Sequence, residues 1–491
     1  MTEEIGRECK FAIHIPANQK RPDTHLIKET IHYADGTTKP HVKFVKDFKR
    51  PFYVTRPSFR NHRQKKEYEH VDNLLEVFTT QSNLRDEVAK LLGKSFTNDH
   101  IKKLSTSPFL YGSDISSTSL IKKAYQNKYP NCTSRYTVAT LDIETDVIGG
   151  TETVIITTVA YQNQCYTAVL KDFLAGYVSI AQSKIKEAEE RYIGEYLKDK
   201  NIVSETYIAN DPVDLLKHVF SKIHEWQPDI LAIWNMNFDI PRIMKVLEQY
   251  KVDPAGIFCD PCVPKDFRIC RYKEGQTKKI MASGKVIPIN FEAQWHTLIC
   301  TSSYYILDAM CTYKFNRLSE PSEPSYALDA LLAKHKVLRK LKFEEASQYT
   351  DLKWHEVMQA DYKIEYIVYN KVDCLSMLDL DEETKDLAYT LPNSADTTDF
   401  SKYKSMPSKI MDAFYHFLKT KGFILGTVGY ADKDEEDDTE IEDDTLGLNG
   451  WIVCLDSMLQ VPGMNCIAED PLLHTGIRCY VYDSDRKLGR S

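Results

Sequence analysis

The chain has 491 residues, enough for about two to four domains that each bury a hydrophobic core. Its composition, 42% hydrophobic and 27% charged, is that of a globular protein, and the lack of an 18-residue apolar run argues against a membrane-spanning helix. The net charge is −8, and the twelve cysteines are scattered through the chain, which predicts reduced thiols in a cytoplasmic protein.

The net charge conceals a strong local imbalance. The segment Asp432–Asp444 holds ten acidic residues and one lysine, so the rest of the chain sums to about +1. We expect a solvated acidic loop at 432–444, either without further function or able to repel misplaced DNA or bind a basic partner. The nearly neutral remainder is compatible with a nucleic-acid partner.

A basic, aromatic region lies between Lys43 and Lys66, with nine Lys or Arg residues against one acid. Cations interleaved with aromatic rings suit a nucleic-acid strand, whose phosphates need neutralising and whose bases can stack. The alternative is a strand with its aromatic side chains in the core and a solvated basic face. The residues proposed to contact DNA are Lys43, Lys46, Lys49 and Arg50.

From about residue 133 the pattern alternates between strands and helices, which predicts an α/β domain with a layered core. The expected strands are Val154–Tyr161, Cys165–Leu170 and Asp229–Asn235, and the expected helices are 177–198, Asp214–Trp226 and Ala360–Asp379.

Two carboxylates, Asp142 and Glu144, follow an apolar run and are separated by Ile143. In a strand, residues i and i+2 project to the same face, so both acids point one way while Ile143 enters the core. Paired carboxylates on a buried strand are costly unless a cation neutralises them. The pair therefore predicts a divalent-metal site, against the alternative of two exposed acids on an edge strand.

Further acids follow at positions that suit the same site. Asp239 comes just after the strand expected at Asp229–Asn235, at the edge where α/β active sites gather, and Pro241 fits the first turn of the next helix. Tyr369 and Asp373 are four residues apart in the long helical pattern, so they lie on one helix face. Each taken alone is compatible with a capping residue or a surface pair.

These residues resemble the three exonuclease motifs of B-family DNA polymerases, the group that includes the replicative enzymes of T4-like phages. Asp-Ile-Glu at 142–144 resembles the first motif, Asn-Met-Asn-Phe-Asp at 235–239 the second, and Tyr-Asn-Lys-Val-Asp at 369–373 the third. Supporting similarities bracket them at Lys46–Val54, Ile306–Met310, Ser325–Asp329 and Met406–Phe414.

The resemblance implies a ribonuclease-H-like 3′→5′ exonuclease that removes nucleotides from single-stranded or frayed primer ends of DNA. Asp142, Glu144, Asp239 and Asp373 would hold two Mg²⁺ or Mn²⁺ ions, Tyr369 would contact the attacking water or the phosphate, and Asn235 and Phe238 would position the terminal nucleotide. The implied domains are an N-terminal domain (1–134), the exonuclease domain (135–395) and an incomplete palm (396–491). The implied location is the cytoplasm of the host cell or a viral replication compartment.

Two segments between the second and third motifs carry weaker signals. Arg271–Lys285 is basic and punctuated by glycine, and by position it resembles the family's strand-separating hairpin, with Arg271 and Lys273 as DNA contacts; a solvated loop is the alternative. Cys259 and Cys262, with Cys270, His296 and Cys300 beyond them, raise the possibility of a zinc site, although a clear second cysteine pair is lacking.

The C-terminal region departs from the family pattern. A strand-like run ends in Asp483-Ser484-Asp485, which suits the first palm motif with Asp485 as a metal ligand, but the family's Ser-Leu-Tyr-Pro does not follow. We therefore expect either a split polymerase completed by a second polypeptide or a truncated chain. The alternatives from other classes are a non-catalytic DNA-binding subunit and a free-standing nuclease of the same fold.

Overall fold

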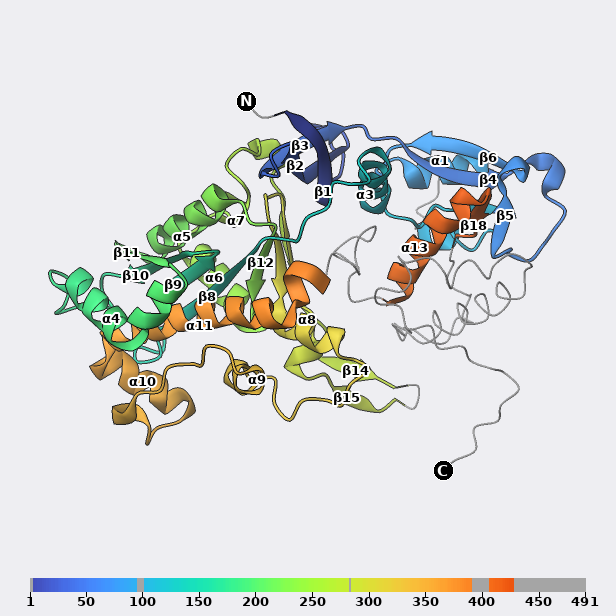
Figure 1. Ribbon diagram of the computed structural model, residues 1–491. Helices are drawn as coiled ribbons and strands as arrows, with labels where there is room; N and C mark the ends of the chain where they lie inside the picture. Colours follow the sequence, from blue (N-terminus) through green and yellow to red (C-terminus); the bar gives the residue numbers. More distant parts are fainter. Residues whose placement is uncertain (1–2, 95–100, 282–283, 391–405, 428–491) are drawn as a thin grey trace. The chain divides into compact units, whose positions relative to one another are not determined.

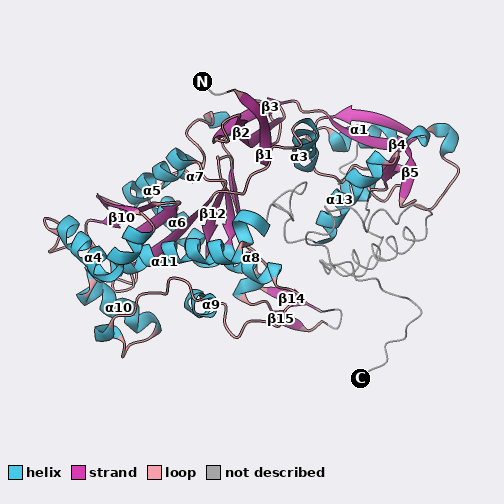
Figure 2. Cartoon of the chain, viewed as in Figure 1, coloured by secondary structure: helices cyan, strands magenta, loops and turns pink. Residues whose placement is uncertain are grey.

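The computed structural model describes residues 3–94, 101–281, 284–390 and 406–427 (Figure 1). Within these residues the chain is mixed α/β, as predicted (Figure 2). It divides into two compact units: unit 1 comprises Met1–Ala34, Lys43–Cys132 and Pro392–Ser491, and unit 2 comprises Asp35–Val42 and Thr133–Leu391. The acidic loop expected at 432–444 and the palm ligand proposed at Asp485 lie outside the described residues. None of the described helices combines the length and apolar character needed to cross a bilayer.

Unit 2 is built on a mixed sheet with the strand order β11-β10-β9-β8-β12-β17. Strand β9 runs antiparallel to its neighbours β8 and β10, whereas β10–β11, β8–β12 and β12–β17 pair in parallel. The strands predicted from the sequence are present, with ends shifted by a few residues at most. Their bounds are β8 (Val138–Thr145), β9 (Val154–Tyr161), β10 (Gln164–Leu170), β11 (Val203–Ala209), β12 (Ile230–Ile233) and β17 (Tyr305–Asp308).

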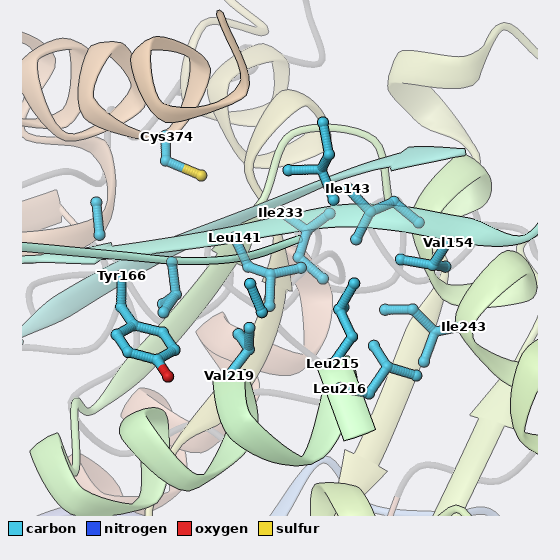
Figure 3. Packing of buried hydrophobic residues seen from close by; sticks show 14 of the residues in the cluster. Leu141, Ile143, Val154, Tyr166, Leu215, Leu216, Val219, Ile233, Ile243 and Cys374 are labelled. Carbon is cyan, nitrogen blue, oxygen red and sulfur yellow. The ribbon is translucent and has the colours of Figure 1, made fainter. Parts of the chain in front are cut away.

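Helices cover both faces of this sheet, so its central strands β9, β8 and β12 are buried along nearly their whole length. Helix α5 (Pro212–Trp226) packs on β9, β10 and β11, and helix α11 (Lys363–Thr384) packs on β8, β9 and β10, with α4 (Ala181–Asp199) beside it. Figure 3 shows Leu215 and Val219 of α5 on one side of the strands and Cys374 of α11 on the other. Thr140, Asp142 and Glu144, which alternate with Leu141 and Ile143 along β8, face α11 and form hydrogen bonds with Cys374, Asn370 and Tyr366 of that helix.

Local signals explain where the helices of unit 2 begin. Asp211 caps α5, because its carboxylate accepts hydrogen bonds from the N–H groups of Val213 and Asp214 at 2.8 Å, and Pro212 occupies the first turn. Helix α6 (Met236–Gln249) differs from expectation. It begins at Met236, so Asp239 lies within its first turn and Pro241 lies inside the helix rather than at its start.

The rest of unit 2 consists of short elements after α6. A ladder pairs β13 (Cys270–Lys273) with β16 (Thr297–Cys300). A hairpin pairs β14 (Lys278–Ile280) with β15 (Val286–Pro288), as Figure 1 shows. The helices of this region are α7 (Ala255–Phe258), α8 (Ala309–Asn316), α9 (Leu328–His335) and α10 (Asp351–Asp361).

Unit 1 contains three groups of paired strands and several helices. β1 pairs antiparallel with β2, β4 lies between β6 and β7, and β18 pairs with β5. The strands are β1 (Glu4–Ile15), β2 (Thr24–Tyr33), β4 (Arg50–Thr55), β5 (Tyr68–His70), β6 (Leu74–Thr79), β7 (Leu110–Tyr111) and β18 (Phe423–Leu425). The helices are α1 (Leu84–Leu91), α2 (Ile101–Leu104), α3 (Ser117–Lys128) and α13 (Met406–Thr420). Strand β3 (Thr38–Lys46) begins in unit 2 and ends in unit 1.

Helix α13 and strand β18 belong to the compact unit that also contains the N-terminal part of the chain. Phe414, Tyr415 and Leu418 of α13 form one buried cluster with Tyr53 and Tyr111 from the N-terminal part of the chain. The described residues beyond 405 therefore complete the core of unit 1. This association was not visible in the sequence, because the two segments are nearly 300 residues apart.

The basic, aromatic region is divided between the core and the surface. Phe52 and Tyr53 of β4 are buried, which supports the core alternative for these rings, whereas Phe59 is exposed. Arg50 is also buried: its guanidinium donates to Gln81 Oε1 at 2.7 Å and to the carbonyls of Gly112 and Ser113 at 3.1 Å. The prediction that Arg50 contacts DNA is therefore wrong, because its charge is held inside the fold. The proposed contacts Lys43, Lys46 and Lys49 are exposed.

Candidate metal centre

The candidate site lies where β8 faces α11. Asp142 and Glu144 project from β8 on the side opposite Leu141 and Ile143, as strand alternation predicts. Two side chains of α11 meet them: Asn370 Nδ2 donates to Asp142 Oδ2 at 2.7 Å, and Tyr366 OH donates to Glu144 Oε2. The orientation of both carboxylates is thus determined by a helix more than 200 residues further along the chain.

Asp373 of α11 completes a compact carboxylate cluster with this pair. One oxygen each of Asp142, Glu144 and Asp373 lies within 4.8 Å of the other two, and Glu144 and Asp373 are buried. Among the described residues, this is the only group of three or more His, Cys, Asp or Glu side chains arranged closely enough to hold a metal ion. The cysteines considered for a zinc site form no such group there.

The electrostatics of the cluster are compatible with a bound cation. Burial, followed by the charge of Asp373, raises the pKa of Asp142 to about 8. Burial, followed by the charge of Asp142, raises the pKa of Glu144 well above its usual range, and burial also raises the pKa of Asp373. Oδ1 of Asp373 is buried and has no hydrogen-bond partner. An unpartnered carboxylate oxygen beside two more carboxylates fits a hard divalent cation, which prefers oxygen ligands.

Asp239 lies close to the cluster without belonging to its tightest group. It is buried in the first turn of α6, and burial followed by the charges of Asp142 and Glu144 raises its pKa well above its usual range. The other two residues of the second motif flank it. Asn235 precedes the helix with its Oδ1 buried and unpartnered, whereas Phe238 is 39% exposed.

Lys340 also reaches the site, and like Tyr366 and Asn370 it is not among the site residues predicted from the sequence. Lys340, in the segment between α9 and α10, places Nζ 2.5 Å from Asp373 Oδ2 and 3.0 Å from the hydroxyl of Tyr369. Burial would lower the pKa of Lys340, but the neighbouring Asp373, Tyr369 and Asp142 raise it well above its usual range. The sequence around Lys340 does not single it out as a site residue, because Lys336–Lys342 is a basic run typical of a surface segment.

His355 contacts the hydroxyl group of Tyr366. Nδ1 of His355 lies 2.7 Å from the Tyr366 hydroxyl and 3.7 Å from Glu144 Oε2. Burial lowers the pKa of His355 to about 4, so this ring is neutral near pH 7. Because Tyr366 donates its proton to Glu144, Nδ1 of a neutral His355 can donate to the oxygen of Tyr366. This relay holds the phenol in place behind the carboxylate.

The remaining predicted contacts, Arg271 and Lys273, lie on β13 and are exposed.

Neither a scan against models of known protein families nor a search among curated proteins finds a match for this chain. The function is therefore inferred from the chemistry of the site itself.

Proposed function

We propose that unit 2 is a metal-dependent 3′→5′ DNA exonuclease of the kind found in B-family DNA polymerases. The observation that carries the proposal is the carboxylate cluster of Asp142, Glu144 and Asp373, with Asp239 coupled to it by charge. Its members come from the three segments that resemble the family's exonuclease motifs. The strand order β10-β9-β8-β12-β17, with β9 antiparallel, supports a ribonuclease-H-like core.

Asp142, Glu144 and Asp373, with Asp239 nearby, would hold Mg²⁺ or Mn²⁺. Bound by these carboxylates, such ions would supply Lewis-acid chemistry: activation of a water molecule and stabilisation of the leaving oxygen in a displacement at phosphorus. In the reaction, water forms a new bond to the terminal phosphorus while the bond to the 3′ oxygen of the preceding nucleotide breaks, and that oxygen takes up a proton. The products are a nucleoside monophosphate and a strand shortened by one residue.

The chain's own side chains have distinct parts in this proposal. The Tyr369 hydroxyl, held by Lys340 at 3.0 Å, is available to hydrogen-bond the attacking water or the scissile phosphate. Lys340 adds positive charge where a phosphodiester would approach the acids. Phe238, exposed beside Asp239, offers a ring on which the terminal base can stack.

The test is digestion of a 5′-labelled single-stranded oligonucleotide in Mg²⁺ or Mn²⁺. We expect stepwise shortening from the 3′ end by the wild type, none without a divalent ion, and a loss on the order of a thousandfold in Asp142→Asn and Asp373→Asn. Glu383→Gln is the matched control, because Glu383 is an exposed acid on the same helix α11. Equal activity in Asp142→Asn, Asp373→Asn and the wild type would refute the assignment.

A further inference from the structure

Arg242 covers one face of the Phe238 ring. Its guanidinium carbon lies 3.6 Å from the ring centroid, and its Nη1 donates to the Phe238 carbonyl at 3.1 Å. The two residues are one turn apart on α6, so the guanidinium lies directly against the aromatic side chain. Phe238 nevertheless remains 39% exposed, which leaves ring surface available to a ligand.

A carboxylate outside the metal cluster holds Arg242 in this position. Nη2 of Arg242 lies 3.4 Å from Glu152 Oε1, and Nζ of Lys245 lies 2.8 Å from Glu152 Oε2. Glu152 belongs to the loop after β8, and its backbone N–H donates to the Asp146 carbonyl at 3.2 Å. The ion pair therefore connects the end of the strand that carries Glu144 to the first turns of the helix that carries Phe238 and Asp239.

We propose that Arg242 is a positioning residue that presents the exposed ring of Phe238 as a stacking surface for the terminal base of a single-stranded 3′ end. This inference rests on the proposed function, in which the terminal base stacks on Phe238, and adds Arg242 as the residue that orients the ring. A planar guanidinium stacks on an aromatic face in a way that a lysine ammonium does not. Stacking is tolerant of base identity, since every base has a π-face, and this suits removal of any terminal nucleotide.

The experiment compares Arg242→Gln with Lys245→Gln on two oligonucleotides, one with a normal 3′ end and one whose 3′-terminal residue is abasic. Both variants remove one cation from Glu152, but only Arg242→Gln uncovers Phe238. On the normal strand we expect Arg242→Gln to raise KM roughly five- to tenfold, with kcat within about twofold of the wild type. On the abasic strand it should match the wild type, and Lys245→Gln should leave both substrates nearly unchanged.

Equal losses for Arg242→Gln on the two substrates, or equal effects of the two variants, would overturn the proposal, because either result means a general loss of charge or folding. Arg242→Lys separates charge from stacking and should recover less than half of the lost affinity. A strand with 2-aminopurine at its 3′ end, bound in EDTA, reports stacking without hydrolysis. We expect Arg242→Gln to bind this strand more weakly than the wild type and to quench its fluorescence less. Equal quenching by Arg242→Gln and by the wild type would refute the inference. A wild type that binds this strand but never digests it would refute the proposed function alone.

Discussion

Lys340 forms an ion pair with Asp373, with Nζ 2.5 Å from Oδ2, and the same nitrogen lies 3.0 Å from the Tyr369 hydroxyl. The Lys340 ammonium group thus contacts both Tyr369 and Asp373, the first and last residues of the segment that resembles the third exonuclease motif. A metal ion at the cluster can use the other oxygen of Asp373, Oδ1, which is buried and unpartnered. The lysine and the metal therefore need not compete for the same oxygen atom.

Replacing Lys340 with methionine should lower kcat for exonuclease digestion on the order of a hundredfold, because the site loses a fixed positive charge beside the reacting phosphate and Tyr369 loses its partner. Single-turnover digestion in saturating Mg²⁺ measures this effect. Lys342→Met is the matched control, since Lys342 is exposed and lies two residues away. Similar rates for the two variants would show that Lys340 has no part in the chemistry.

Removing the hydroxyl in Tyr366→Phe should weaken Mn²⁺ binding roughly tenfold, because Glu144 loses the donor that orients it. Isothermal titration of the metal-free protein with Mn²⁺ measures the change. Tyr196→Phe is the control, since Tyr196 donates to Asp379 at 2.9 Å, outside the carboxylate cluster. If both variants bind Mn²⁺ like the wild type, the hydroxyl of Tyr366 does not support the metal site.

The metal-free protein should lose stability as the pH rises from about 4 to about 8. The pKa of Asp142 is raised from 3.8 to about 8 in the folded chain, so between these pH values the carboxyl group is protonated when folded and ionised when unfolded. Unfolding therefore releases a proton over this pH range, and raising the pH favours the unfolded state. Thermal melts in EDTA at pH 5 and pH 8 measure the effect, and Asp142→Asn should reduce the difference. Mg²⁺ should stabilise the wild type more at pH 8 than at pH 5. A melting temperature that rises with pH in EDTA, equally in both proteins, would contradict this expectation.

Lys371→Met should destabilise the fold by about 3–5 kcal/mol, because it leaves the carboxylate of Glu189 buried without its cation. Nζ of Lys371 is fully buried and donates to Glu189 Oε1 at 2.6 Å, Ser204 Oγ at 2.9 Å and Thr206 Oγ1 at 2.7 Å. Urea denaturation measures the free energy of unfolding. The double variant Lys371→Met with Glu189→Leu should recover much of the loss, and a double variant no more stable than the single one would show that charge burial is not the cause.

Local periodicity accounts for much of what the sequence could predict. β9 begins and ends where predicted, because an apolar β-branched run has little alternative to a buried strand. The sequence pattern predicts too late a start for α6, because a proline favours the first turn of a helix, whereas Pro241 lies inside α6. The burial of Arg50 was missed for a related reason: a basic run resembles a solvated surface until its partners, Gln81 and the carbonyls of Gly112 and Ser113, are known.

That Asp142 and Glu144 share a strand face and that Tyr369 and Asp373 share a helix face can be predicted from the sequence, because both relations follow from the repeat of a single element. The meeting of these two faces, the contacts of Asn370 and Tyr366 with the acids and the ion pair of Lys340 with Asp373 depend on the tertiary fold. Those contacts join segments between 33 and 228 residues apart. No local period encodes such distances, since they result from the packing of α11 and the segment before α10 around one sheet.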